Sequence, residues 1–175
     1  MASPLPGAGP GLASAGQGDA RDRILAVLDA HHVMSLATNR PDGWPQVTLV
    51  NYLQVEGALY CLIARDSQKF ANIQRDGRVS IAVGGGFPPV GPVGLSMSAL
   101  ASEVVDPVQV RRLNTALWNR PAGRGFAPHP ASHNVAMIEA RPQIIVMNDY
   151  TTPPGRSDVV DWTAAGPTPS PDAAP

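Results

Sequence analysis

Short apolar runs separated by turn-forming residues fill the middle of the chain. Residues 33–38 form one such run, and the segment 39–43 that follows contains a proline and an Asp-Gly step. Residues 45–55 then alternate between two faces that are both partly apolar. A period of two is typical of β-strands, and Pro, Asp and Gly supply the backbone angles that hairpin turns require. This region therefore predicts two strands joined by a hairpin.

The same pattern continues towards the C-terminus. It predicts further strands over 59–63, 78–83, 93–105, 135–139 and 143–147, and the last two are separated by a bend at Arg141-Pro142. Six or seven strands with hairpin connections and few helices indicate a mainly β (α+β) protein. Their arrangement favours an antiparallel barrel over a parallel sheet.

Helical patterns occupy three short segments. Asp19 can cap a helix that ends near His31-His32, and Asp106-Pro107 is a typical start for a helix that ends near Trp118. A third helix, over 67–73, begins with a serine cap.

The two ends of the chain differ from the middle in composition. Residues 1–18 and 151–175 are rich in Pro, Gly, Ala, Ser and Thr, and large apolar side chains are scarce there. Such segments bury too little surface to offset the entropy cost of ordering, so we expect disordered tails around a single domain over 19–150. Residues 119–132 contain three prolines, two glycines and two arginines, which predicts a long loop.

Composition excludes several classes of function. With 13 basic and 14 acidic residues the net charge is −1, so the chain lacks the positive field that non-specific nucleic-acid binding needs. Cys61 is the single cysteine, which fits a reducing compartment. Neither a signal-peptide pattern nor an apolar run of membrane-spanning length is visible. We therefore expect a cytoplasmic protein that binds neither nucleic acid nor membranes.

Metal binding is also not expected. His129 and His133 are four residues apart, but Pro130 lies between them and no cluster of cysteines or carboxylates accompanies them.

The clearest chemical signal is the only lysine of the chain. Lys69 follows Ser67 where an apolar strand gives way to a short helix. Backbone N–H groups at a helix start, a hydroxyl and an ammonium can converge on one oxyanion, as a cofactor phosphate requires. Ser-x-Lys by itself is also a common serine cap followed by a solvated lysine. In its strand context we interpret it as the phosphate end of a flavin site.

The order of these elements over residues 34–83 resembles the pyridoxamine 5′-phosphate oxidase-like family of FMN-binding split β-barrels. The resemblance rests on short motifs: Ser35-Leu36-Ala37-Thr38, residues 42–50, Leu59-Tyr60, Ser67-Gln68-Lys69, Asn72-Ile73 and Arg78-Val79-Ser80. A weaker resemblance extends to about Met147. The resemblance implies a homodimer in which the partner subunit completes the cofactor site.

The resemblance also implies positions for the cofactor. Ser67 and Lys69 match the family's phosphate element, and Arg65 is near enough to assist. The flavin ring and ribityl chain would lie along two strands, against Gln46, Val47, Thr48, Asn51, Leu62 and Ile63. Amide and hydroxyl side chains such as Gln46, Thr48 and Asn51 suit the hydrogen-bonding edge of the ring, although each taken singly fits the wet face of an antiparallel strand.

The chain departs from a true pyridoxamine phosphate oxidase in one respect. It lacks the family's arginine-rich substrate motif near the C-terminus, so we do not expect vitamin B6 oxidation. Composition makes Trp118, Arg120 and Arg124 candidates for a substrate lid. No catalytic residue is assigned.

The expected function is that of an FMN-dependent oxidoreductase acting on a small molecule, with NADH or NADPH as the candidate reductant. Two alternatives stay open. One is a non-enzymatic protein that binds or senses flavin or haem, because the same fold supports different functions. The other is a reductase that uses the deazaflavin F420, whose long polyanionic tail calls for several basic residues.

Overall fold

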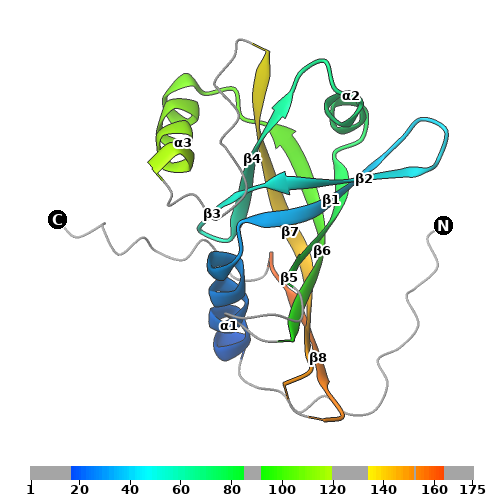
Figure 1. The fold of residues 1–175 in the computed structure, drawn as a ribbon, viewed down its shortest axis with the longest axis vertical. Helices are drawn as coiled ribbons and strands as arrows, with labels where there is room; N and C mark the ends of the chain where they lie inside the picture. The colour runs from blue at the N-terminus through cyan, green and yellow to red at the C-terminus, as the bar shows by residue number, and fades with distance from the viewer. Residues whose placement is uncertain (1–16, 85–91, 120–133, 152, 164–175) are drawn as a thin grey trace.

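The computed structural model describes residues 17–84, 92–119, 134–151 and 153–163 (Figure 1). Its elements in chain order are α1 (Gln17–Ala30), β1 (Val33–Asn39), β2 (Pro45–Asn51), β3 (Leu53–Val55), β4 (Ala58–Ala64), α2 (Gln68–Arg75), β5 (Arg78–Gly84), β6 (Val93–Glu103), α3 (Pro107–Asn119), β7 (Val135–Asp149) and β8 (Arg156–Asp161). All the paired strands are antiparallel and belong to one curled sheet, which forms a half-barrel. The predicted mainly β split barrel is thus confirmed.

The strand order explains why the sheet curls. Neighbouring strands follow the path β2-β1-β5-β6-β7-β4-β3, and β8 pairs with β7. β2 and β3 are consecutive in the chain but lie at opposite ends of this path. The segment 45–55 therefore links the two ends of the sheet and holds them together.

The single strand predicted over 45–55 is wrong, because Tyr52 interrupts it. Its side chain is 1% exposed, its backbone N–H donates to the His32 carbonyl at 3.0 Å, and its phenol donates to the Leu28 carbonyl at 2.7 Å. Because Tyr52 makes these hydrogen bonds to the junction between α1 and β1, it pairs with neither neighbouring strand. The chain then pairs with β1 before Tyr52 and with β4 after it.

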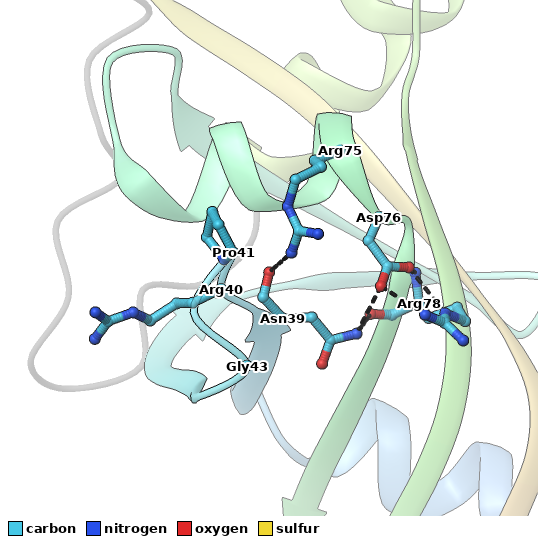
Figure 2. A pocket seen from close by; sticks show the side chains of 7 residues that line it. All are labelled: Asn39, Arg40, Pro41, Gly43, Arg75, Asp76 and Arg78. Carbon is cyan, nitrogen blue, oxygen red and sulfur yellow. Dashed lines mark hydrogen bonds and ion pairs between the residues drawn. The ribbon is translucent and has the colours of Figure 1, made fainter.

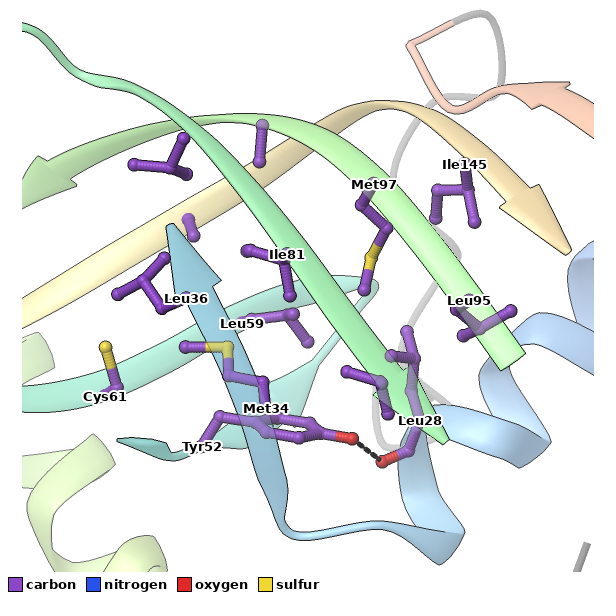
Figure 3. Close-up of a cluster of buried hydrophobic side chains, with 14 of the residues drawn as sticks. Leu28, Met34, Leu36, Tyr52, Leu59, Cys61, Ile81, Leu95, Met97 and Ile145 are labelled. Carbon is purple, nitrogen blue, oxygen red and sulfur yellow. Dashed lines mark hydrogen bonds between the residues drawn. The ribbon is translucent and has the colours of Figure 1, made fainter. Parts of the chain in front are cut away.

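The main core lies inside the curl of the sheet (Figure 3). Alternate residues of β5 and β6 point inward, including Ile81, Leu95 and Met97, each of which is about 2% exposed. From α1, Ile24 and Leu28 add to this core; they are four residues apart and therefore share one helix face. Full burial of such side chains contributes about 1.5–3 kcal/mol each. A smaller cluster of Ala58, Tyr60, Leu113 and Met137 joins α3 to the sheet.

The last predicted strand pair is also different in the structure. β7 runs unbroken for 15 residues, and the expected break at Arg141-Pro142 is a shift of register. Ala99 pairs with Pro142 whereas Ser98 pairs with Ile144, which leaves Gln143 as an extra residue. Such an irregularity accommodates a proline, because the missing N–H falls where the ladder is already disturbed.

The C-terminal segment expected to be a tail contains a strand. β8 pairs with β7, and its inward residues Asp158 and Val160 are buried, as is Trp162 just beyond it. The indole Nε1 of Trp162 donates to the Gly57 carbonyl at 3.2 Å. Two large apolar side chains therefore dock this segment, although its average composition is that of a tail. Residues 1–16 and 164–175 lie outside the described residues, as do most of the connection at 84–89 and of the loop at 119–132.

The starts of α2 and α3 agree with the sequence, but the cap expected at Asp19 is wrong, because this residue lies inside the first helix. α1 begins at Gln17, with Asp19 in its first turn. Asp106 caps α3, because its carboxylate accepts from the backbone N–H of Val108 at 3.0 Å. Within the described ranges, no helix combines the length and the apolar character needed to cross a membrane.

Candidate cofactor site

The site begins where β4 ends and α2 starts. Ser67 has an extended backbone, and its Oγ accepts from the Phe70 N–H at 3.2 Å and donates to the Ala64 carbonyl at 2.7 Å. The predicted serine cap is therefore confirmed, and its hydroxyl proton is already used. The backbone N–H groups of Gln68 and Lys69 lie in the first helical turn, where no intrahelical acceptor exists. Those two groups are the donors available to an anion at this helix start.

Lys69 is half-buried beside β4. Burial lowers the pKa of its ammonium, and the thiol of Cys61 on β4 is close enough to interact with it electrostatically. Burial in turn raises the pKa of Cys61 to about 12, so the thiol remains neutral. Among the residues that the structure describes, no carboxylate forms an ion pair with Lys69. A partly desolvated ammonium without a counter-ion is electrostatically suited to bind an anion.

Arg65 is engaged elsewhere. Its guanidinium pairs with the Glu103 carboxylate through both terminal nitrogens, one of them at 3.3 Å, and lies 5.5 Å from the centroid of the Phe70 ring. Glu103 thus already compensates its charge. The role of Arg65 in phosphate binding stays a prediction.

A buried polar network lies beneath α2. Asn72 is 0% exposed and donates to the Thr38 hydroxyl at 3.0 Å and to Gln46 Oε1 at 3.2 Å. Its own Oδ1 accepts from Gln68 Nε2 at 2.9 Å. Because the Gln46 oxygen is turned towards Asn72, its amide nitrogen remains as a donor for another partner. Sequence reasoning included Asn72 in the family pattern but did not assign it to the site.

Thr48 follows Gln46 on the same face of β2. Its hydroxyl oxygen is buried, and no hydrogen-bond partner is present in the described part of the chain. An unpaired buried hydroxyl is unfavourable by about 1–3 kcal/mol, and a ligand would remove this penalty. The arrangement therefore fits a bound group that carries hydrogen-bonding atoms.

The predicted site residues divide between several environments. Gln46 and Thr48 lie on the side of β2 that faces α2, whereas Val47, 62% exposed, and Asn51 lie on the opposite side. Leu62 packs into the α3 cluster, and Ile63 is part of the main core. The structure thus brings Gln46 to the same helix as Ser67 and Lys69 and places Thr48 on the same face of β2, but it does not bring Val47 or Leu62 to that face.

The candidate substrate residues lie largely outside the part of the chain that the structure describes. Trp118 belongs to α3, but its side chain lies outside the described residues, as do Arg120 and Arg124. The same holds for His129 and His133. Among the described residues, no group of three or more His, Cys, Asp or Glu side chains could hold a metal ion.

The outer face of the sheet carries uncharged residues across five strands. Pairing aligns two neighbouring rows, namely Val47, Ala37, Ser80, Ser98 and Ile144, and next to them Leu49, Ser35, Ala82, Ser96 and Val146. Val47, Leu49 and Ile144 are 62%, 66% and 41% exposed. Exposed apolar patches of this kind on soluble proteins are typical of interaction surfaces.

The chain was compared with family models, curated proteins and solved structures. The family model of pyridoxamine 5′-phosphate oxidase matches residues 20–148. A search of curated proteins finds no match.

A pyridoxamine 5′-phosphate oxidase-related, FMN binding protein from Nostoc punctiforme has 16% identity and a TM-score of 0.60, over 86% of this chain and 93% of its own. A heme binding protein from Mycobacterium smegmatis has 17% identity and a TM-score of 0.68, over 87% of this chain and 61% of its own. An F420 reductase has 27% identity and a TM-score of 0.54, over 69% of this chain and 93% of its own. At such low identity the first two show a common fold.

Proposed function

The chain belongs to the pyridoxamine 5′-phosphate oxidase family, and from this premise we propose that it is an FMN-dependent oxidoreductase acting on a small molecule. The observation that supports the proposal best is the half-buried ammonium of Lys69, which no described carboxylate neutralises, at the start of α2. It is the charge that a cofactor phosphate requires. The reaction would take place in the cytoplasm, with NADH or NADPH as the reductant.

The residues around α2 suit the parts of FMN. Lys69 and the backbone N–H groups at the start of α2 would hold the phosphate, since helix N-termini attract anions. The free amide nitrogen of Gln46 and the orphaned hydroxyl of Thr48 would bind the polar edge of the ring. Bound flavin would accept and transfer the hydride, and the protein's task is to bind and orient it and to exclude water.

The test is Lys69→Ala. Removal of one charge-assisted hydrogen bond, worth about 1.5–3 kcal/mol, should weaken FMN binding by about 10- to 150-fold. Folding should be largely unaffected, because the partly buried ammonium has no described partner to lose. Binding is measured by quenching of flavin fluorescence, and the melting temperature is recorded alongside. Arg111→Ala, an exposed cation on α3, is the matched control. Unchanged FMN affinity in Lys69→Ala would contradict the proposal.

The protein is further proposed to act as a homodimer through the outer face of the sheet. An aspartate in place of Leu49, the exposed apolar residue at the β2 end of one uncharged row, would bring unpaired charge into that interface. Leu49→Asp should therefore produce a monomer in analytical ultracentrifugation. Val108→Asp on α3, where the valine is 64% exposed, is the control and should remain dimeric. A wild-type protein that is monomeric at micromolar concentration would refute this part.

A deazaflavin is the second cofactor to test, because the F420 reductase has the highest identity among the three structures compared. Titration of the apoprotein with FMN and with the deazaflavin, each followed by fluorescence, compares the two directly. Tighter deazaflavin binding would replace FMN in the proposal. Haem is tested in the same way, by its absorption band. Bound flavin that NADH and NADPH do not reduce would favour a binding or sensing role over catalysis.

A further inference from the structure

The side chain of Asn72 joins α2 to two neighbouring strands. β1 and β2 pair so that Thr38 lies directly opposite Gln46. From α2, Asn72 Nδ2 donates one hydrogen to the Thr38 hydroxyl at 3.0 Å and the other to Gln46 Oε1 at 3.2 Å. Its Oδ1 accepts from Gln68 Nε2 at 2.9 Å. Because both hydrogens of this fully buried amide are used, Asn72 cannot turn without breaking these bonds.

The C-terminal end of α2 is attached to the same strand, β1 (Figure 2). Arg75, one turn after Asn72, donates to the backbone carbonyl of Asn39 at 2.6 Å. Asn39 follows Thr38 in β1, and its Nδ2 donates to the carboxylate of Asp76, just beyond the helix, at 3.1 Å. The helix is thus bonded to β1 on both sides of one turn. These bonds fix the direction in which Asn72 points.

The amide of Gln46 consequently presents only one of its two polar atoms to a ligand. The terminal torsion of a glutamine is broad and roughly two-fold, so a free amide can offer either its nitrogen or its oxygen. In this protein Oε1 is bonded to Asn72. The half-buried residue leaves Nε2 reachable, and no acceptor binds that nitrogen in the described part of the chain. A ligand at Gln46 therefore meets a hydrogen-bond donor.

This donor lies beside the turn of α2 that carries Lys69. Lys69 and Asn72 are three residues apart and are therefore neighbours on the helix surface. Gln46 is bonded directly to Asn72, so its amide is within reach of a ligand that the ammonium anchors. Asn72 thus links the charge proposed to hold a phosphate to the donor proposed to meet a ring.

We propose that Asn72 is a positioning residue of the cofactor site: it holds the Gln46 amide as a donor, so the site selects a ring that presents a hydrogen-bond acceptor there. This inference rests on the proposed function. The carbonyl oxygens and unprotonated ring nitrogens of a flavin are such acceptors. A ring with an N–H at the same place would leave two donors facing each other, and sites built for a hydrogen bond discriminate strongly against a ligand that cannot form it.

The experiment uses riboflavin as the probe, because riboflavin carries the flavin ring without the phosphate. Gln46→Glu keeps an oxygen for Asn72 but replaces the donor with a second acceptor. It should weaken the binding of riboflavin and of FMN by the same factor, at least about tenfold, as measured by fluorescence quenching. Gln74→Glu adds the same charge at an exposed position of α2 and should change neither affinity.

Asn72→Asp tests the positioning itself. An ionised aspartate only accepts hydrogen bonds, so Gln46 must turn its nitrogen towards position 72 and its oxygen towards the ligand. Riboflavin affinity should again fall at least about tenfold. In NMR spectra, the side-chain amide signal of Gln46 should shift on addition of riboflavin to the wild type and should not shift in this variant. If Asn72→Asp does not fold, Gln46→Glu and the wild-type spectra decide the question.

Three results would overturn the inference and leave the proposed flavin function standing. The first is unchanged riboflavin affinity in Gln46→Glu. The second is a loss for FMN alone, which would indicate repulsion between the new carboxylate and the phosphate. The third is a Gln46 amide signal that riboflavin does not shift in the wild type.

Two further results separate this inference from the proposed function. Wild-type protein that binds neither flavin would contradict both. Unchanged FMN affinity in Lys69→Ala would contradict the proposed phosphate anchor alone, because riboflavin binding in Gln46→Glu still tests the amide.

Discussion

Removal of the Asn72 side chain should destabilise the protein more than any other change beneath α2. Asn72 is completely buried and makes three hydrogen bonds, to Thr38, Gln46 and Gln68. In Asn72→Ala, the two glutamine side chains can turn towards water, since neither is buried. Thr38 is 1% exposed and cannot, so its hydroxyl would lose a partner inside the protein.

The size of the effect follows from these contacts. An unsatisfied hydroxyl at Thr38 costs about 1–3 kcal/mol, and the two remaining hydrogen bonds contribute about 1 kcal/mol each. The higher helix propensity of alanine offsets about 0.5 kcal/mol of the loss. The free energy of unfolding should therefore decrease by about 3 kcal/mol. For a chain of this length that corresponds to a fall in melting temperature of roughly 6–12 °C.

Urea denaturation of the apoprotein, followed by circular dichroism, measures this change. Gln68→Ala is the matched control, because it removes only one of the three bonds and its side chain is exposed. That control should lose less than about 1 kcal/mol. Equal losses in the two variants, or a loss below about 1 kcal/mol in Asn72→Ala, would refute the assignment of Asn72 as the centre of the network.

Three further predictions concern other parts of the fold. Burial and, to a smaller extent, the charge of His32 lower the pKa of His31 below 6.5 in the folded state. As the pH falls, His31 is therefore protonated in the unfolded chain before it is protonated in the folded protein. Stability should thus be full above about pH 6.5 and decrease as the pH falls towards the folded-state pKa, and urea midpoints of His31→Gln should show a weaker decrease. Tyr52→Phe removes the bond to the Leu28 carbonyl and should cost about 1–2 kcal/mol by the same assay. Arg65→Ala breaks an exposed ion pair and should change stability by less than about 1 kcal/mol, with the difference reduced further in salt.

The fold could be predicted wherever the pattern is local. Alternation identified the strands, and the caps of α2 and α3 are set by residues within three positions of each helix start. The break at Tyr52 could not be predicted, because it depends on a hydrogen bond to a residue 24 positions away. β8 was missed for a different reason. The apolar residues that dock it are too few to change the average composition of a Pro- and Ala-rich segment.

In the candidate site, too, local features could be predicted from the sequence and tertiary contacts could not. Ser67 is recognisable from sequence because a cap acts on its own helix. Arg65 pairs with Glu103, which lies 38 residues further along the chain. A local sequence motif cannot predict such a tertiary contact. Asn72 could have been suspected, since it precedes the buried Ile73 and shares its side of a short helix. A polar residue at such a position usually has a buried partner, but the sequence does not say which one.

The charge balance at α2 bears on the choice of cofactor. A phosphate monoester carries about −1.5 to −2 charges near neutral pH. Lys69 supplies one positive charge, and the N-terminus of a helix contributes about half a charge more. These two terms nearly neutralise one phosphate, so Arg65 can remain with Glu103. A cofactor with a longer polyanionic tail would need further cations beside Lys69, and Arg65, four residues before it in the sequence, is already paired with Glu103. On this charge balance we propose FMN rather than a deazaflavin as the cofactor.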